Sequence, residues 1–152
     1  MLIYFAGPLF NQAELEFNAG LTDKLEALGY DVFLPQRDGV ESSKPPYTDM
    51  TREERRRATF ELDRDQIITA DIFMIILDGR VPDEGAAVEL GIAYMDKRLT
   101  HPNKYLVGLQ TDVRAAFMNS RLNPMLRVPL DLIASTVEEL IANLDRHRKE
   151  AD

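Results

Sequence analysis

The stretch Ile72-Phe-Met-Ile-Ile-Leu77 decides the fold, because it is an unbroken apolar run with three isoleucines. A short run without polar alternation predicts a strand that is buried on both faces. Similar runs lie at residues 2–6, 30–34 and 105–109, and residues 126–134 predict a last strand. A sheet of such strands needs helices over each of its faces.

Helical periodicity fills the stretches between these runs, at residues 12–28, 51–70, 83–97 and 136–148. Alternating strands and helices predict a parallel sheet, because parallel neighbours need crossover connections. With 152 residues, the chain has the length of one domain. We therefore expect a single domain over residues 1–152 with a flavodoxin-like (Rossmann-like) α/β fold, a parallel five-stranded sheet with helices on both faces.

Composition excludes several classes of function. The chain has 26 acidic and 18 basic residues, and its net charge of −8 opposes binding to a nucleic acid polymer or an anionic membrane. It has no cysteine for disulfides or thiol chemistry, and its two histidines, His101 and His147, lack the spacing of a metal site. The apolar run at residues 2–6 is too short for a signal peptide or a membrane span. We expect a cytoplasmic protein that binds a small molecule.

The loops that follow the strands are the expected place for chemistry. In parallel sheets of this kind, ligands bind beyond the carboxyl ends of the strands. These loops hold Gly7 and Pro8, residues 35–38 and residues 78–83, and residues 42–46 predict a flap beside the site.

Glu89 is the acidic residue that a purely structural role explains least. Its neighbours on the helix form an apolar and mostly small face, made of Gly85, Ala86, Ile92 and Ala93. A buried, unpaired carboxylate costs several kcal/mol or shifts its pKa, so Glu89 needs partners or a task. The structural alternative is a buried glutamate that Tyr4 or an arginine satisfies. Asp83, at the start of the same helix, by itself indicates a cap.

Residues of other elements converge on the same edge of the predicted sheet. Tyr4 lies in the first strand and by itself indicates core, while Gly7 ends that strand in a turn that lets a ligand approach the backbone. The Gln36 amide can donate and accept, as recognition of a nucleobase edge requires, or is a polar loop residue. In the helix before the third strand, Asp63 or Asp65 could turn inward, and spacing does not choose between them.

Several familiar catalytic motifs do not occur. The sequence has no glycine-rich dinucleotide motif, no P-loop and no Gly-x-Ser-x-Gly elbow. Dinucleotide redox chemistry, triphosphate hydrolysis and serine-hydrolase chemistry therefore lack support, and carboxylate chemistry remains.

Five short pieces between residues 3 and 125 form a combination that is specific in order and spacing. They are Ile3-Tyr-Phe-Ala-Gly-Pro-Leu-Phe10, Gln36-x-x-Gly39, Asp63, Asp83-x5-Glu89-Leu-Gly91 and Asn123-Pro-Met125. Together they resemble the nucleoside 2-deoxyribosyltransferase family. The resemblance implies transfer of 2-deoxyribose between nucleobases through a covalent deoxyribosyl–enzyme ester, with net retention. Its partners would be deoxynucleosides and free nucleobases, and neither a metal nor an organic cofactor is required.

The resemblance also implies a role for each matching residue. Glu89 would be the nucleophile and Tyr4 would orient it, while Asp63 and Asp83 would handle the base and its proton, and which of the two is the general acid stays open. Substrate contacts are expected at Gly7, Phe10, Gln36, Asp38, Asn123 and Met125. The last two match positions that the family lends to a neighbouring subunit's site, which implies a homo-oligomer built on a dimer unit, with tetramer and hexamer as larger options.

Two other functions compete with this reading. An N-glycosidase of deoxynucleoside 5′-monophosphates would need phosphate donors, and the first loop, Gly7-Pro-Leu-Phe-Asn11, has no arginine or serine. A non-catalytic nucleotide-sensing module could share the scaffold, because a fold alone does not establish activity. The Asp83 and Glu89 pair argues against such a module. The preference for purine or pyrimidine bases stays open.

Overall fold

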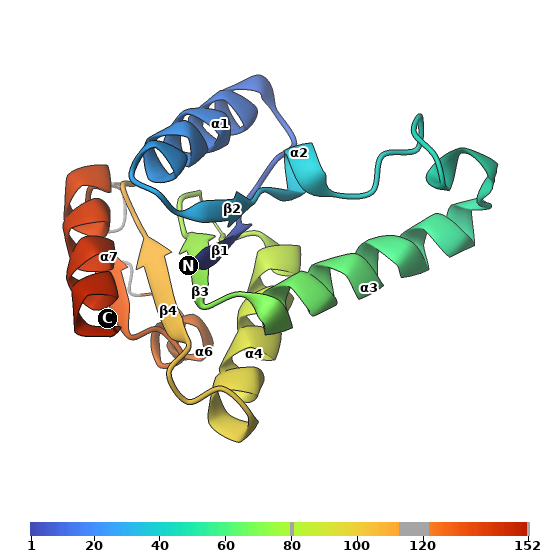
Figure 1. Cartoon of the computed structure of the whole chain (residues 1–152). Helices are drawn as coiled ribbons and strands as arrows, with labels where there is room; N and C mark the ends of the chain where they lie inside the picture. The colour runs from blue at the N-terminus through green and yellow to red at the C-terminus, as the bar shows by residue number, and fades with distance from the viewer. Residues whose placement is uncertain (80, 113–121, 152) are drawn as a thin grey trace.

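The computed structural model describes residues 1–79, 81–112 and 122–151, and its centre is a parallel sheet (Figure 1). Its strands are β1 (Leu2–Ala6), β2 (Asp31–Phe33), β3 (Ile72–Ile76), β4 (Tyr105–Leu109) and β5 (Leu132–Ala134). All neighbours pair in parallel in the order β2-β1-β3-β4-β5. This is the flavodoxin-like order, and it confirms the predicted fold.

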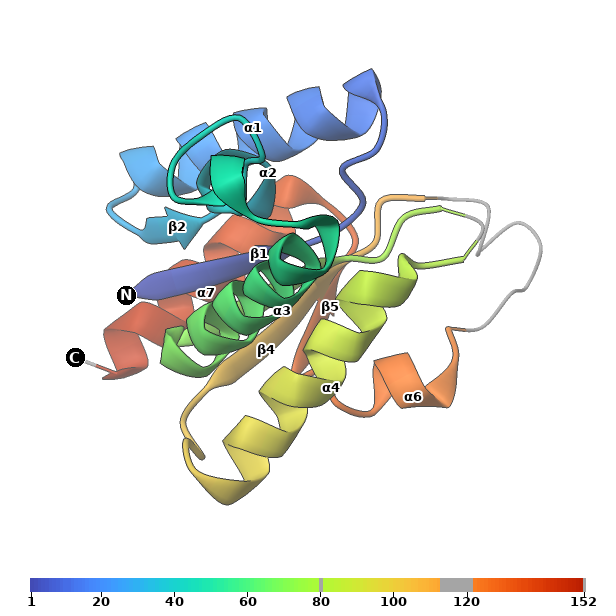
Figure 2. The ribbon, with the colours of Figure 1, turned by 90° about the vertical axis from the view of Figure 1, so that its right-hand side faces the viewer.

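Helices cover both faces of the sheet (Figure 2). The pair on one face is α1 (Gln12–Ala27) and α7 (Val137–Ala151), and the pair on the other is α3 (Arg52–Thr69) and α4 (Glu84–Leu99). Short turns of helix lie at α2 (Pro35–Asp38), η1 (Tyr47–Asp49) and α6 (Pro124–Arg127). In the described part of the chain, no helix is both long and apolar enough to cross a membrane.

The alternation of side chains along β1 divides the core into two halves. Ile3 and Phe5 pack in the apolar cluster under α1 and α7. Tyr4 and Ala6 point to the opposite face and pack in the cluster under α3 and α4. Successive residues of a strand point to opposite faces, so β1 delivers Tyr4 to the side where α4 carries Glu89.

Side-chain caps fix the starts of α1, α3 and α4. Asn11 caps α1 and Thr51 caps α3, each in a reciprocal capping box with a glutamate three residues later. Asp83 caps α4, and its side chain accepts a hydrogen bond from the Ala86 amide. The cap fixes where α4 begins, and with it which residues of α4 face the sheet.

Two local predictions are wrong. Only residues 132–134 of the predicted strand at 126–134 are extended, and its start belongs to α6, where Asn123 caps and Pro124 takes the first helical position. Residues 35–38 form α2 instead of a loop, again with a proline at the first turn. Both short helices begin with proline, whose fixed φ suits a helix start.

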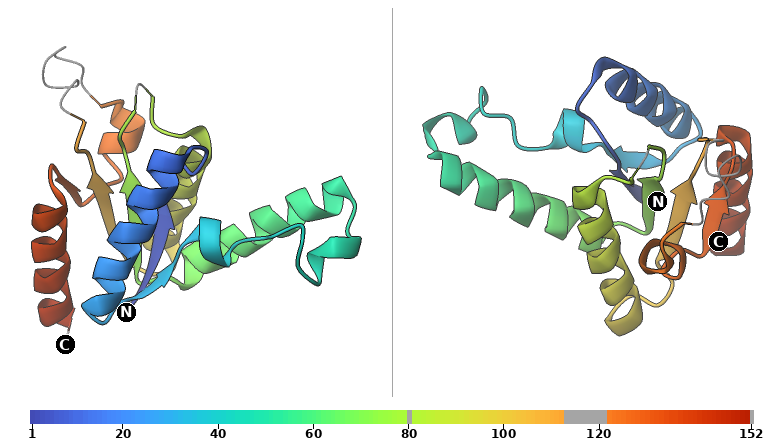
Figure 3. Two further views of the ribbon diagram at one scale, coloured as in Figure 1. Left: turned by 90° about the horizontal axis from the view of Figure 1, so that it is seen from above. Right: turned by 180° about the vertical axis from the view of Figure 1, so that it is seen from behind.

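The N-terminal half of α3 extends away from the sheet, together with the segment that precedes it (Figure 3). This arrangement carries residues 42–46 to the outer end of α3 and not over the carboxyl edge of the sheet. The flap predicted beside the site is therefore not seen at that place.

Candidate active site

A hydrogen bond between Tyr4 and Glu89 joins β1 to α4. The Tyr4 hydroxyl donates to Glu89 Oε1 at 3.0 Å. Strand register places Phe33 and Phe73 beside Tyr4, and their rings stack on the tyrosine ring with centroids 5.5 and 5.8 Å away. Because the ring is fixed on both sides, the hydroxyl has a defined position under α4. Tyr4 is thus a core residue and also the hydrogen-bond partner of Glu89. From the sequence alone, these are two separate interpretations.

Glu89 lies on α4 next to the face that packs on the sheet. Ala86, Leu90 and Ala93 of this helix are buried, while Glu89 itself is half-buried. Burial raises the pKa of Glu89 to about 7; the hydrogen bond from Tyr4 acts in the opposite direction, and the charges of Asp63 and Asp83 raise it further. The carboxyl group therefore changes its charge near neutral pH, unlike an ordinary surface glutamate.

Asp63 of α3 is the aspartate that faces this site. Its side chain is half-buried, and burial raises its pKa to about 6. Its charge also raises the pKa of Tyr4 and that of Glu89, which places it near both groups. Asp65 instead pairs with Arg64 at 2.7 Å, and its side chain is 60% exposed. The structure thus resolves the alternative that spacing left open.

Asp83 stands at the first turn of α4, where it combines two effects. Its Oδ1 accepts the amide of Ala86 at 2.8 Å, and its charge acts on Glu89. Gly85 leaves room for this arrangement, since a Cβ there would lie 3.1 Å from Asp83 Oδ1.

The first loop and α2 are held together by a residue that the sequence analysis missed. Asn18 of α1 is buried, and its amide donates to Pro8 O at 2.9 Å and to Gln36 Oε1 at 3.1 Å. The Gln36 amide donates in turn to Leu15 O at 2.9 Å. A signal did exist, because Asn18 shares the helical face of the apolar residues three and seven positions later.

Gly7 packs closely against the end of β3 at the point where β1 ends. A Cβ at this position would lie 3.1 Å from Cβ and Cγ1 of Ile76, the last residue of β3. This distance is tighter than an ordinary van der Waals contact, so a side chain at residue 7 would force Ile76 or the loop to shift. The glycine therefore has a packing reason independent of any ligand.

The other predicted contact residues are Asp38, Phe10, Met125 and Asn123. Asp38 accepts from Leu34 N and from Arg37, and although burial opposes its ionisation, these bonds keep its pKa below the usual value. Phe10 is 76% exposed before α1, and Met125 is 79% exposed on α6. Asn123 Oδ1 accepts from the Met125 amide as the cap of α6. The contacts of these side chains do not test their expected roles.

The cluster therefore consists of three carboxyl groups and one phenol, carried by β1, α3 and α4. Tyr4 donates to one of the two carboxyl oxygens of Glu89, Oε1. Among residues 1–79, 81–112 and 122–151, no group of three or more His, Asp or Glu side chains is placed to hold a metal ion. The cluster can supply a carboxylate nucleophile beside a carboxylic acid whose pKa is raised.

Fold and cluster together define a flavodoxin-like α/β protein with a carboxylate site between α3, α4 and the sheet. The chain belongs to the nucleoside 2-deoxyribosyltransferase family, whose pattern matches residues 3–144. No curated protein sequence matches the chain closely enough to add to this assignment.

The fold also occurs in solved structures of other proteins. A conserved protein from Enterococcus faecalis V583 is 27% identical, with a TM-score of 0.73 over 96% of this chain and 98% of that one. A 2-deoxyribosyltransferase from Bacillus psychrosaccharolyticus is 24% identical, with a TM-score of 0.72 over 92% of this chain and 90% of that one. The CMP N-glycosidase BcmB from Clostridium botulinum is 18% identical, with a TM-score of 0.53 over 95% and 99% of the two chains. The last two likenesses show a shared fold.

Proposed function

We propose that the protein transfers 2-deoxyribose from one nucleobase to another through a covalent deoxyribosyl ester on Glu89. The observation that carries the proposal is the hydrogen bond of 3.0 Å from Tyr4 to Glu89. It holds a half-buried carboxyl group in one orientation, beside two further carboxyl groups that act on its pKa. Family membership supports nucleosides as the substrate class.

In the first half-reaction, Glu89 attacks the anomeric carbon of the deoxynucleoside. The bond from that carbon to the base breaks, its electron pair goes to the base nitrogen, and the developing cationic sugar is stabilised by the ionised carboxylate. Tyr4 donates to Oε1, so Oε2 is the oxygen that forms the ester. The ester carbon has the inverted configuration.

Asp63 is the better proton donor to the leaving base. Its raised pKa of about 6 keeps a useful fraction protonated near neutral pH. Asp83 Oδ1 accepts the Ala86 amide at 2.8 Å, and its other carboxyl oxygen can accept a hydrogen bond from the base. The proposal thus assigns the acid role to Asp63 and a binding role to Asp83.

In the second half-reaction, a ring nitrogen of the acceptor base attacks the ester carbon. The ester bond breaks, Glu89 regains its charge, and the proton of the acceptor base passes to Asp63. Two inversions give net retention. Water in place of the acceptor would release free deoxyribose, so slow hydrolysis should accompany transfer. The reaction needs neither a metal ion nor an organic cofactor.

We further propose that the site is shared between subunits of a homo-oligomer, built on a dimer unit. Met125 is 79% exposed and Val128 is 71% exposed, both at α6. Two such apolar side chains near one another on a surface are typical of a region that a partner covers. In this arrangement Asn123 of one subunit would contact the sugar 5′-hydroxyl in the neighbouring site, and Gln36 with Phe10 and Asp38 would contact the base. A cytoplasmic location of the protein would suit these substrates.

One assay separates transfer from its alternatives. The protein is mixed with deoxyinosine and free adenine, and in parallel with thymidine and cytosine, and the products are followed by chromatography. New deoxyadenosine or deoxycytidine demonstrates transfer, whereas release of the free base alone indicates hydrolysis. An absence of products in both pairs would refute the proposed activity and favour a sensing module.

Two variants test the assignment of the nucleophile. Glu89→Ala and Glu89→Gln should fold and lose exchange, and intact-mass analysis of the wild type during turnover should show a deoxyribosyl adduct. Glu61→Gln, which changes an exposed glutamate on α3, is the matched control and should exchange normally. Full activity of either Glu89 variant would refute the covalent mechanism.

Subunit mixing tests the shared site. Glu89→Gln and Asn123→Ala are each expected to have little activity alone. After denaturation and refolding together, mixed dimers hold one site with both Glu89 and Asn123 intact, so activity should return. A mixture that stays as inactive as its components would show that each subunit acts alone.

A further inference from the structure

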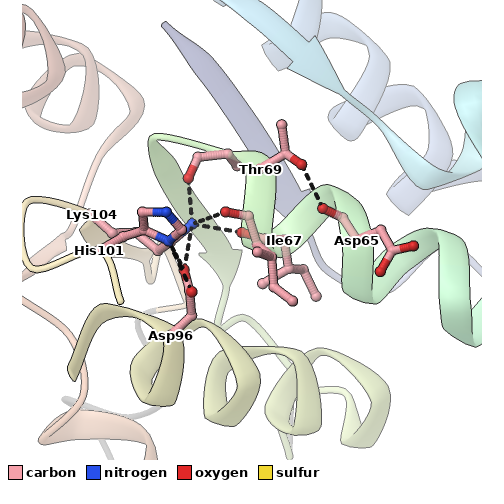
Figure 4. Close-up of polar contacts among 8 residues, drawn as sticks. Asp65, Ile67, Thr69, Asp96, His101 and Lys104 are labelled. Carbon is pink, nitrogen blue, oxygen red and sulfur yellow. Dashed lines mark hydrogen bonds and ion pairs between the residues drawn. The ribbon is translucent and has the colours of Figure 1, made fainter. Parts of the chain in front are cut away.

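Lys104 is a buried lysine that the proposed reaction does not use. It lies directly before β4, only 3% of its surface is exposed, and its Nζ donates to Ile67 O at 2.7 Å and to Ile68 O at 3.2 Å (Figure 4). It also donates to Ala70 O and pairs with Asp96 Oδ2 at 3.2 Å. One ammonium group thus contacts the end of α3 and the last turns of α4.

These contacts explain why a charged group is tolerated there. The last carbonyls of a helix have no partner within it, and a cation is favourable beside them. Burial lowers the pKa of Lys104, whereas the hydrogen bond and charge of Asp96, and the charge of Asp71, act to keep it protonated. His101 also contacts Asp96, with its Nδ1 at 2.9 Å from Oδ1. Lysine and aspartate therefore form a clamp between two helices.

The same two helices carry the carboxyl groups of the site. Asp63 precedes Ile67 by four residues, so it lies on the same side of α3, one turn closer to the outer end. Glu89 precedes Asp96 by seven residues, which is two turns along one side of α4. The clamp and the site therefore lie along the same seam between α3 and α4, one to two turns apart.

We propose that Lys104, through Asp96, is a positioning residue that fixes α3 against α4 and thereby sets the separation of Asp63 from Glu89. The inference rests on the proposed function, because it concerns the two groups that handle the proton and the sugar. A displacement of about 1 Å between reacting groups can reduce turnover about a hundredfold. The groups that face Glu89 would respond together, since Tyr4, Asp63 and Asp83 all act on its charge.

The variants must break the clamp without leaving a buried charge alone. Lys104→Met would leave Asp96 without its buried partner, so the double variant Lys104→Met with Asp96→Leu is the main test. Asp96→Asn is a milder change that keeps the bonds of Lys104 to the carbonyls of α3. The matched control is Lys97→Met, because Lys97 lies next to Asp96 but pairs with Asp131 at 2.6 Å instead of contacting α3.

The readouts are kcat and KM for transfer and an NMR titration of the ¹³C-labelled carboxyl group of Glu89. In the double variant we expect kcat to fall at least about tenfold, with little change in KM, and the Glu89 pKa to fall from about 7 towards its usual value as water enters the seam. Asp96→Asn should move both readouts in the same direction by less, and Lys97→Met should leave both as in the wild type.

The titration separates failure of this inference from failure of the proposed function. If the wild type catalyses no transfer, the proposed function fails, and the Glu89 titration still tests the clamp. A lower melting temperature with an unchanged Glu89 titration and kcat would show that the clamp is structural only and would overturn the proposal. If the double variant does not fold, kcat and the Glu89 titration are measured on Asp96→Asn instead, and unchanged values of both would overturn the proposal.

Discussion

Replacing Glu89 with glutamine removes a carboxyl group whose pKa is raised by the folded structure. The pKa of this group rises from the ordinary value of 4.5 to about 7 in the folded protein, chiefly because it is buried. The native state therefore binds this proton more tightly than the unfolded chain does. The resulting contribution to stability is present below about pH 4.5 and is lost as the pH rises through about 7.

The size of the effect follows from the shift. One pKa unit corresponds to about 1.4 kcal/mol, so the rise from 4.5 to about 7 corresponds to about 3 kcal/mol of unfolding free energy. Glutamine keeps an oxygen that can accept from Tyr4 and carries no charge at any pH. Relative to the wild type, Glu89→Gln should therefore gain about 3 kcal/mol on going from acid to pH 8, with most of the gain between pH 5 and pH 8.

Urea unfolding followed by circular dichroism at pH 5, 6, 7 and 8 measures this gain. All variants are compared at one protein concentration, because association of subunits also contributes to stability. Glu61→Gln is again the control, since Glu61 is exposed and its removal should leave the pH dependence as in the wild type. A difference between Glu89→Gln and wild type that is the same at every pH would refute the reasoning.

Three further predictions concern the same cluster and the loop beside it. Tyr4→Phe removes the hydrogen bond that lowers the Glu89 pKa, so the acid limb of the pH profile of kcat should move to higher pH. An acid limb that does not move would show that Tyr4 does not control the ionisation of Glu89. Asp63→Asn should slow release of ordinary purine bases by about a hundredfold or more. Release from 7-methyl-2′-deoxyguanosine should keep its rate, because that base is already cationic and needs no proton. Equal losses of rate with both donors would argue against Asp63 as the proton donor. Gly7→Ala places a Cβ 3.1 Å from Ile76 and should lower the unfolding free energy by about 1–3 kcal/mol, measured by urea titration, whereas no loss would show that the loop can shift.

Much of the scaffold was predictable because its signals are local. Buried parallel strands appear in the sequence as apolar runs, and the cap expected at Asp83 is the cap that begins α4. The short helices α2 and α6 were not predicted, since four residues carry too little periodicity to separate a turn of helix from a loop or strand. Hydrophobic periodicity therefore predicts the long helices and strands and their order better than it predicts the short segments that connect them.

The sequence by itself determined that Glu89 lies on a face of small and apolar residues, because residues three and four positions apart on a helix are neighbours whatever the rest of the chain does. Only the tertiary structure decided that Tyr4 is its partner, that Asp63 and not Asp65 faces it, and that Lys104 joins the two helices. These relations span 85 residues between Tyr4 and Glu89 and 37 between Ile67 and Lys104. They arise from strand register and from the packing of α3 and α4 on one face of the sheet, and no local pattern encodes either.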